Sequence, residues 1–156
     1  MLGRAGRPQF DDSATAIIMT RAENIDRYNR MVSGQEILES TLHLNLIEHL
    51  NSEIGLGTVH DIYSAKRWLA GTFLSVRMRK NPSYYKFSSD TGSRDADERL
   101  EGVCERDIEL LKSHKLISED QRFMCTEYGQ AMAKYMVQFE TMKSLLSIPK
   151  NAKMTQ

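Results

Sequence analysis

The amino-acid sequence predicts a mainly α-helical fold with a small β wing, and three observations lead to this prediction. From residue 37 onward, apolar residues recur every three or four positions, which is typical of helices that bury one face. Two short apolar pieces, 116–117 and 123–125, flank the polar turn "SEDQ", which favours a β-hairpin. Glycines, prolines and capping residues mark where the helical stretches start and stop.

Residues 1–36 contain too little apolar sequence for a core of their own. Residues 1–12 are predicted to form a loop, and residues 14–20 ("ATAIIMT") a strand that is buried on both faces. A short helix is predicted next, with Ile25, Tyr28 and Val32 on one side and Gly34 at its end. One strand and one helix cannot enclose a core, so we expect these residues to be the last pieces of another domain.

Residues 37–81 are predicted to form two helices. The first ends at Gly55 and Gly57 and buries the stripe Leu42, Leu46, Leu50 and Ile54. Thr58 and Asp61 form a T-x-x-D capping box at the start of the second helix, which ends before Pro82. Its predicted inward residues are Ile62, Ala65, Leu69, Phe73 and Val76.

The remaining residues complete the predicted domain. After a loop, Ser93 is expected to cap a helix whose buried stripe is Leu100, Val103, Cys104, Ile108 and Leu111. The hairpin follows, and Thr126 caps a last long helix that Pro149 ends. One face of that helix carries Tyr128, Met132, Tyr135, Met136, Phe139 and Met142. Three helices, a two-stranded wing and a further helix describe a winged-helix domain; the alternative is a small helical bundle with an incidental hairpin.

Composition narrows the possible functions. Lys and Arg number 21 and so do Asp and Glu, so bulk charge gives no reason to expect nucleic-acid or membrane binding. Cys104 and Cys125 are interpreted as buried free thiols in a reducing compartment. His43 and His49 lie six residues apart and do not share a helix face, which argues against metal ligation. No apolar run is long enough to cross a membrane or to form a signal peptide.

The stretch "LGRAGRPQFD" closely resembles motif VI of the superkiller-type branch of superfamily-two helicases. The segments that follow also resemble that branch in order: "ATAIIMT", "ESTLHLNLIEHLNSEI", "SAKRWLAGTFLSVRMRKNPSYY" and "FMCTEYGQAMAKYMVQFETMK". The similarity is strongest to the meiotic crossover DNA helicases. It implies that residues 1–36 are the C-terminal remnant of the second RecA-like α/β domain, residues 37–148 the winged-helix domain with its linking helix, and residues 149–156 a tail.

The resemblance also implies roles for the first residues. Arg4 and Arg7 would be arginine fingers that meet the γ-phosphate of ATP from across the nucleotide cleft, and Gly3 and Gly6 would let the backbone turn close to the nucleotide. The sequence has no G-x-x-x-x-G-K-[ST] phosphate loop and no Asp-Glu box. We therefore expect a fragment of a larger ATP hydrolase that uses ATP and Mg²⁺, inactive as an ATPase alone and binding neither by itself.

The expected partners are DNA, with RNA not excluded, and the remaining domains of a nuclear helicase; no membrane partner is expected. A weaker signal for nucleic-acid binding is the group Arg77, Arg79, Lys80 and Tyr84, beside Tyr85. The alternative is that these cations complement a helix dipole and that the tyrosines pack against a neighbouring domain. Two alternative functions remain: a stand-alone winged-helix module that binds nucleic acid or protein, and part of an RNA helicase of the same branch.

Overall fold

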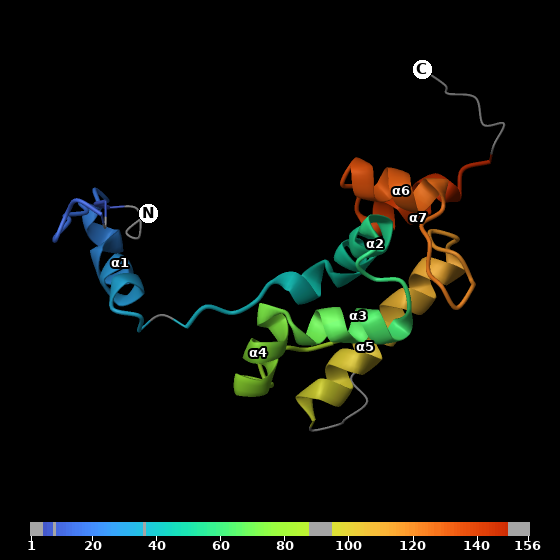
Figure 1. Cartoon of the computed structure of the whole chain (residues 1–156), viewed down its shortest axis with the longest axis horizontal. Helices are drawn as coiled ribbons and strands as arrows, with labels where there is room; N and C mark the ends of the chain where they lie inside the picture. Colours follow the sequence, from blue (N-terminus) through green and yellow to red (C-terminus); the bar gives the residue numbers. More distant parts are fainter. Residues whose placement is uncertain (1–4, 8, 36, 88–94, 150–156) are drawn as a thin grey trace, which may run out of the picture. The chain divides into compact units, whose positions relative to one another are not determined.

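The computed structural model describes residues 5–7, 9–35, 37–87 and 95–149 (Figure 1). The chain divides into two compact units, Met1–Leu38 and Glu39–Gln156. Each unit is described here by itself. Arg4, Gly3 and Ser93, for which the sequence predicts roles, lie outside the described residues.

The first unit contains one short helical segment. A 3-10 helix, η2 (Ala22–Asn24), leads directly into α1 (Ile25–Val32), and Gly34 follows with a φ of 70°. This left-handed conformation suits glycine and stops the helix where the sequence predicts. The predicted helix is therefore confirmed, although none of its residues is buried.

The predicted strand at residues 14–20 does not form. The backbone there has no regular secondary structure, and Ile17 and Met19 are 84% and 93% exposed. A strand requires a neighbouring backbone to hydrogen-bond with, and no other described segment supplies one. The apolar composition of "ATAIIMT" predicts a buried strand, but the described residues contain no sheet in which it could be buried.

The second unit begins with a two-part helix. Residues Leu42–Leu44 form the 3-10 helix η3, and α2 (Leu46–Leu56) follows. The predicted stripe is confirmed at Leu46, Leu50 and Ile54, which are all buried. Gly57 ends α2 with a φ of 79°.

The single helix predicted after Gly57 is in fact two helices, α3 (Ile62–Ala70) and α4 (Phe73–Lys80). The capping box at the start of α3 joins Asp61 to Ser64, and not Thr58 to Asp61. Thr72 caps α4 and restarts the helix on a new register. The restart leaves two predicted core residues, Phe73 and Val76, about half exposed and buries Leu74 and Met78 instead.

The helix α5 (Ala96–Ser113) passes behind α3 in Figure 1, packs against both α3 and α4, and is capped by Asp95. All five residues of its predicted stripe are buried: Leu100, Val103, Cys104, Ile108 and Leu111. The mainly helical class predicted for this chain is therefore confirmed.

The predicted β wing is reduced to one antiparallel bridge between Ile117 and Cys125. The N–H of Ser118 donates to Met124 and the N–H of Thr126 to Leu116, at 2.8 and 2.9 Å. These are hairpin bonds, but the paired segments are too short to count as β-strands, and the described residues contain none. A small β wing is thus not shown.

The last predicted helix is also interrupted. Thr126 caps α6 (Glu127–Lys134) as predicted, and α7 (Phe139–Leu146) begins after a corner at which Met136 has a φ of 52°. The apolar residues predicted to share one face of a single helix are therefore divided between α6, the corner and α7. The buried members of this set are Met132, Phe139 and Met142, and its exposed members are Tyr128, Tyr135 and Met136.

The core of the second unit lies between α2, α5 and α6, with α3 and α4 packed on α5. Two polar contacts join α2 to the end of the chain: Asn51 donates to the carbonyl of Gly129 at 2.8 Å, and Glu48 accepts from the N–H of Phe139 at 2.9 Å. Gly129 lies so close to the carbonyl oxygen of Leu116 that a Cβ there would overlap it. Glycine is thus needed where α6 passes the hairpin.

Candidate functional site

The loop that carries Arg7 is closed on itself by Asp11. The N–H groups of Phe10 and Asp11 donate to the carbonyl of Arg7, and the Asp11 carboxylate accepts from the Arg7 N–H at 2.9 Å. Gly6 precedes this hydrogen-bonded turn and has a φ of 78°. A Cβ at that position would collide with the side chain of Ala14. The glycine is therefore required for the turn.

The guanidinium of Arg7 lies on the surface of this loop, beside Asp11 and Phe10. Its side chain is 80% exposed, its Nε lies 4.0 Å from the Asp11 carboxylate, and its terminal carbon lies 5.7 Å from the centre of the Phe10 ring. Exposed contacts of this kind contribute little energy and are easily exchanged for a stronger one. Arg7 is thus held at its backbone while its charged group stays available to an anion.

A second cluster lies at the start of the second unit. We call Glu39, Arg77, Asn81 and Tyr85 the Glu39 clamp. The Arg77 guanidinium donates to both carboxylate oxygens of Glu39, at 3.1 and 2.8 Å, and both side chains are close to nine-tenths buried. Asn81 and the Tyr85 hydroxyl add donors at 2.8 and 2.7 Å.

Contacts within the Glu39 clamp shift the pKa values of Glu39 and Tyr85. Hydrogen bonds from Arg77 first, and from Asn81 and Tyr85 as well, lower the pKa of Glu39 from 4.5 to about 2. Burial first, and then the bond to Glu39, raise the pKa of the Tyr85 hydroxyl. That hydroxyl also accepts the Ser40 N–H at 2.9 Å. The clamp therefore ties the first residues of the unit to the C-terminal end of α4.

The residues named as weak nucleic-acid contacts fall into different environments. Arg77 is engaged by Glu39, and Arg79 pairs with Asp97 at 2.9 Å on an exposed edge. Lys80 is exposed and makes no ion pair within the described part of the chain. Tyr84 is 52% exposed and packs edge-on against Tyr85. The structure brings these four residues to one end of α4 but gives Arg77 an internal partner.

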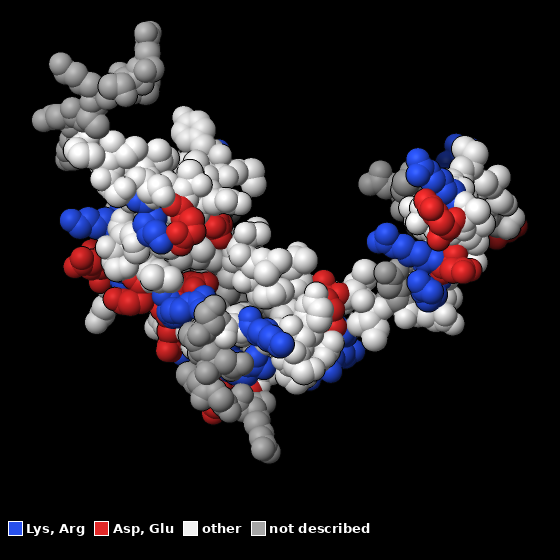
Figure 2. Space-filling model, turned by 180° about the vertical axis from the view of Figure 1, so that it is seen from behind, with Lys and Arg blue, Asp and Glu red and all other residues white. Residues whose placement is uncertain are grey.

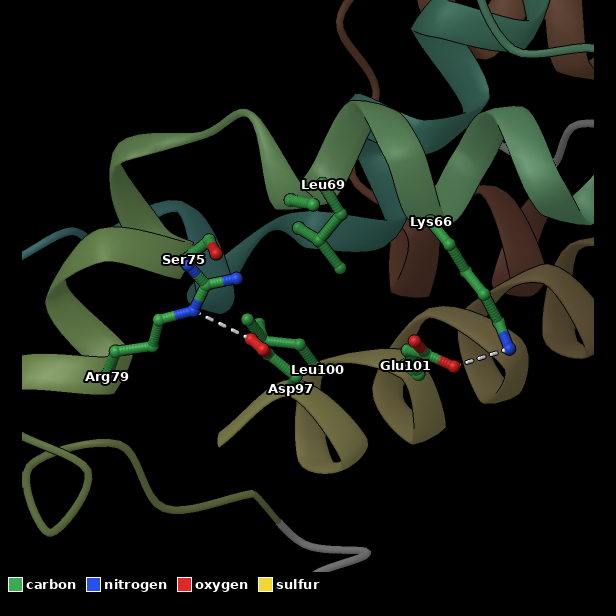
Figure 3. Close-up of a pocket in the computed structure, with 8 residues that line it drawn as sticks. Lys66, Leu69, Ser75, Arg79, Asp97, Leu100 and Glu101 are labelled. Atoms are coloured by element: carbon green, nitrogen blue, oxygen red, sulfur yellow. Dashed lines mark hydrogen bonds and ion pairs between the residues drawn. The ribbon is translucent and has the colours of Figure 1, made fainter. Parts of the chain in front are cut away.

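A cavity of about 140 Å³ lies between α3, α4 and α5, beside Arg79 (Figure 3). Two ion pairs lie among its lining side chains: Lys66 with Glu101 at 2.8 Å, and Arg79 with Asp97. Lys66 also reaches Glu105 at 2.7 Å, and the bonds to these two carboxylates raise its pKa. Lys66 and Arg79 therefore each already have an acidic partner, so neither cation of this cavity is left unpaired.

Other chemistry is sparse in the described residues. They contain no group of three or more His, Cys, Asp and Glu residues that could hold a metal. Burial raises the pKa of the Cys104 thiol to about 12 and that of Cys125 to about 11, so neither is a reactive thiolate at neutral pH. None of the described helices has the length and apolarity needed to cross a membrane.

Charge on the visible surface is mixed. On the face shown in Figure 2, basic and acidic side chains lie next to one another and form no stripe of one sign. This agrees with the equal numbers of basic and acidic residues in the sequence. Nucleic-acid binding by this face would have to rest on a few individual cations.

Sequence reasoning missed the Glu39 clamp and the role of Asn51. Glu39 lies 38 residues from Arg77, and no local spacing links them. Asn51 lies next to Leu50 on α2 and is fully buried. Its side-chain amide donates a hydrogen bond to the carbonyl of Gly129, which lies 78 residues away. Asn51 has polar neighbours in α2, namely Glu48, His49, Ser52 and Glu53, so the sequence holds no local signal that sets it apart.

Comparison with known proteins places the chain among helicase sequences. A family described as the winged helix-turn-helix domain matches residues 39–121. The probable ATP-dependent DNA helicase HFM1 of Mus musculus is 45% identical over 150 residues, which cover 95% of this chain and 10% of the mouse protein. The ATP-dependent DNA helicase MER3 of Saccharomyces cerevisiae is 39% identical over 153 residues, covering 96% of this chain and 13% of the yeast protein.

More distant relatives include RNA-associated helicases. The U5 small nuclear ribonucleoprotein 200 kDa helicase of Caenorhabditis elegans is 34% identical over 149 residues, covering 92% of this chain and 7% of that protein. The chain thus spans about a tenth of the length of the curated relatives that it matches. The superkiller-type resemblance is confirmed by this pattern of DNA helicases followed by RNA-associated ones.

Proposed function

The chain belongs to the winged helix-turn-helix domain family, and from this premise we propose that it serves as the winged-helix region and adjoining motif VI loop of an ATP-dependent DNA helicase of the meiotic crossover type. The observation that supports this most is the reach of the similarity. It extends over 150 residues, or 95% of the chain, and so reaches well beyond the 39–121 match into the first unit.

In this proposal Arg4 and Arg7 stabilise the charge that develops on the γ-phosphate of ATP. A guanidinium stays charged at any working pH and presents a planar fork of donors, and such residues contribute roughly 10³–10⁵-fold in rate. The exposed guanidinium of Arg7 on a backbone fixed by Gly6 supports the role. Gly3 would turn the backbone in the same way. Phosphate binding and Mg²⁺ are assigned to other domains of the helicase.

The second unit is proposed to act mainly as a brace between helicase domains. The Glu39 clamp supports this because it fixes the point at which the chain enters the unit. A lesser contact with the DNA backbone is assigned to Lys80 and Arg79, with Tyr84 available to stack on a base. Arg77, which is bound to Glu39, would hold in place the end of α4 that carries Arg79 and Lys80. A meiotic DNA helicase acts in the nucleus, so the proposed location is nuclear.

The test uses the full-length helicase that contains this sequence. Arg4→Ala and Arg7→Ala should each reduce kcat for DNA-stimulated ATP hydrolysis by roughly 10³-fold or more and leave DNA affinity at fixed salt unchanged. Arg7→Lys should not restore kcat, because an ammonium cannot reproduce the planar fork. Arg21→Ala is the matched control, since Arg21 is an exposed arginine of the same unit.

Two results would contradict the proposal. If the variants lose DNA affinity while kcat is preserved, Arg4 and Arg7 contact DNA and do not contact the γ-phosphate of ATP. Unwinding of an RNA duplex in preference to a DNA duplex of the same sequence would place the protein with the RNA helicases of the branch.

A further inference from the structure

The backbone of Arg7 has both of its polar groups engaged within its own turn. Its carbonyl oxygen accepts the N–H groups of Phe10 and Asp11, each at 2.8 Å. Its N–H donates to Oδ2 of the Asp11 side chain at 2.9 Å. Of these three hydrogen bonds, only the last depends on the identity of a side chain. The Asp11 carboxylate is therefore the part of the turn that a substitution can remove.

The Asp11 carboxylate contacts Arg7 as a hydrogen-bond acceptor more than as a charge. The same Oδ2 lies 4.0 Å from the guanidinium Nε of Arg7, and the two side chains are 42% and 80% exposed. Water screens an ion pair that is so open and so long, so its charge contributes little. The bond to the backbone N–H is much shorter. Asp11 thus fixes the backbone from which the Arg7 side chain starts and leaves the guanidinium able to bond an anion.

The turn is also packed against the residues that follow it. A Cβ at Gly6 would lie 2.8 Å from the Cβ of Ala14, so the chain folds back closely on itself just before Arg7. The guanidinium carbon of Arg7 lies 5.7 Å from the centre of the Phe10 ring, within cation–π range. A group that must meet developing charge benefits from such pre-organisation, because a misplacement of about 1 Å can cost roughly a hundredfold in rate.

We propose that Asp11 is a positioning residue for Arg7 and acts through the hydrogen bond from the Arg7 N–H rather than through its negative charge. This inference rests on the proposed role of Arg7 in ATP hydrolysis. Asp11 itself would touch neither ATP nor DNA. Its loss would let the turn open, so the guanidinium would meet the γ-phosphate less often in the productive geometry. Because that contact belongs to the transition state, kcat would fall while binding of ATP in the ground state stayed the same.

The test measures kcat and KM for DNA-stimulated ATP hydrolysis by the full-length helicase. Asp11→Ala should lower kcat by roughly tenfold to a hundredfold and change the KM for ATP by less than about twofold. Asp11→Asn should keep kcat within about threefold of wild type, because the amide oxygen can accept the same N–H. Asp12→Ala removes the neighbouring exposed carboxylate and is the matched control, which should behave like wild type.

A double-mutant cycle shows whether the effect of Asp11 passes through Arg7. In an Arg7→Ala background, Asp11→Ala should cause no further loss of kcat. An equal further loss, or a loss in Asp11→Asn as large as in Asp11→Ala, would overturn the proposal. The Arg7→Ala variant alone judges the proposed function. A large loss in Arg7→Ala with none in Asp11→Ala would overturn this inference and leave that function standing.

Amide hydrogen exchange of the 156-residue chain tests the hydrogen bond without any catalysis. The Arg7 N–H should exchange at least about tenfold faster in Asp11→Ala than in wild type, because its acceptor is gone. Asp11→Asn should keep most of the protection, which separates the effect of the hydrogen bond from that of the carboxylate charge. Equal exchange in wild type and Asp11→Ala would overturn the proposal.

Discussion

The carboxylate of Glu39 accepts two hydrogen bonds from the guanidinium of Arg77, at 3.1 and 2.8 Å, although the two residues lie 38 positions apart. Both side chains are nearly buried, at 12% and 13% exposure. A bidentate contact of this kind fixes the orientation of the two side chains as well as the distance between them. The first residue of the second unit is thus anchored to the end of α4.

Glu39→Gln should lower the free energy of unfolding at neutral pH. The amide keeps the shape of the side chain but loses the charge and presents an N–H group to donors, leaving Arg77 without its counter-ion in a nearly buried position. Urea unfolding followed by circular dichroism measures the change. Glu53→Gln on α2 is the control and should have little effect. An equal loss in both variants would show that the clamp does not stabilise the unit.

The stabilisation supplied by Glu39 should depend on pH in a defined direction. Its pKa is about 2 in the folded chain and near 4.5 when unperturbed, so the unfolded state binds the proton more readily. The contribution is complete above pH 4.5 and is lost as the pH falls through about 2. The difference in unfolding free energy between wild type and Glu39→Gln should therefore shrink over that window. A difference that stays constant would contradict the assigned pKa.

Gly129→Ala should destabilise the second unit even though alanine is the better helix former. A Cβ at Gly129 would overlap the carbonyl oxygen of Leu116, so the hairpin end and α6 would have to separate. Gly102→Ala is the matched control, because nothing lies within 4 Å of a Cβ there in mid-α5. The control should gain up to about 1 kcal/mol. Thermal melts of both variants give the comparison, and similar behaviour of the two would refute the close approach.

Residues 39–149 should stay folded without residues 1–38. The buried core belongs to the second unit, whereas α1 has no buried residue. Amide hydrogen exchange on the full chain should show slow protons in α2 and α5 and fast ones in α1. The truncated chain should show the same slow set. Comparable protection of α1 would mean that the first unit is stabilised by contacts other than those described.

The 156-residue chain should not hydrolyse ATP by itself. Its sequence lacks a phosphate loop and an Asp-Glu box, and an arginine finger alone supplies neither the bound phosphates nor the Mg²⁺ of the reaction. A steady-state ATPase assay with single-stranded DNA should give the rate of a protein-free blank. Turnover above the blank that Arg7→Ala leaves unchanged would contradict the role given to Arg7.

Helix faces were predictable from the sequence where the apolar spacing is uninterrupted. The stripe of α5 and the glycine ends of α1 and α2 are local signals, and each is confirmed. The break before α4 was missed because the apolar spacing continues through it, from Leu69 to Phe73, and hides the cap at Thr72. The corner between α6 and α7 was missed for the same reason, because Met132, Met136 and Phe139 keep a helical spacing across it.

The candidate site was only partly predictable. Gly6 and Arg7 lie in a short motif that sequence alone can identify. Glu39 and Glu48 act through partners 38 and 91 residues away, and such pairings depend on how the helices pack rather than on spacing along the chain. The expected strand at residues 14–20 failed because strand formation depends on a partner that local composition does not reveal.

The bonds from α2 to Gly129 and Phe139 also set an order of events during synthesis. They span 78 and 91 residues, so the helix made first in this unit finds its final neighbours only when the last helices have been made. Until then, Leu46, Leu50 and Ile54 lack part of the surface that later covers them. Closing so long a segment is slow compared with forming a helix. A nascent chain therefore passes through a stage in which this apolar stripe can be bound by a chaperone.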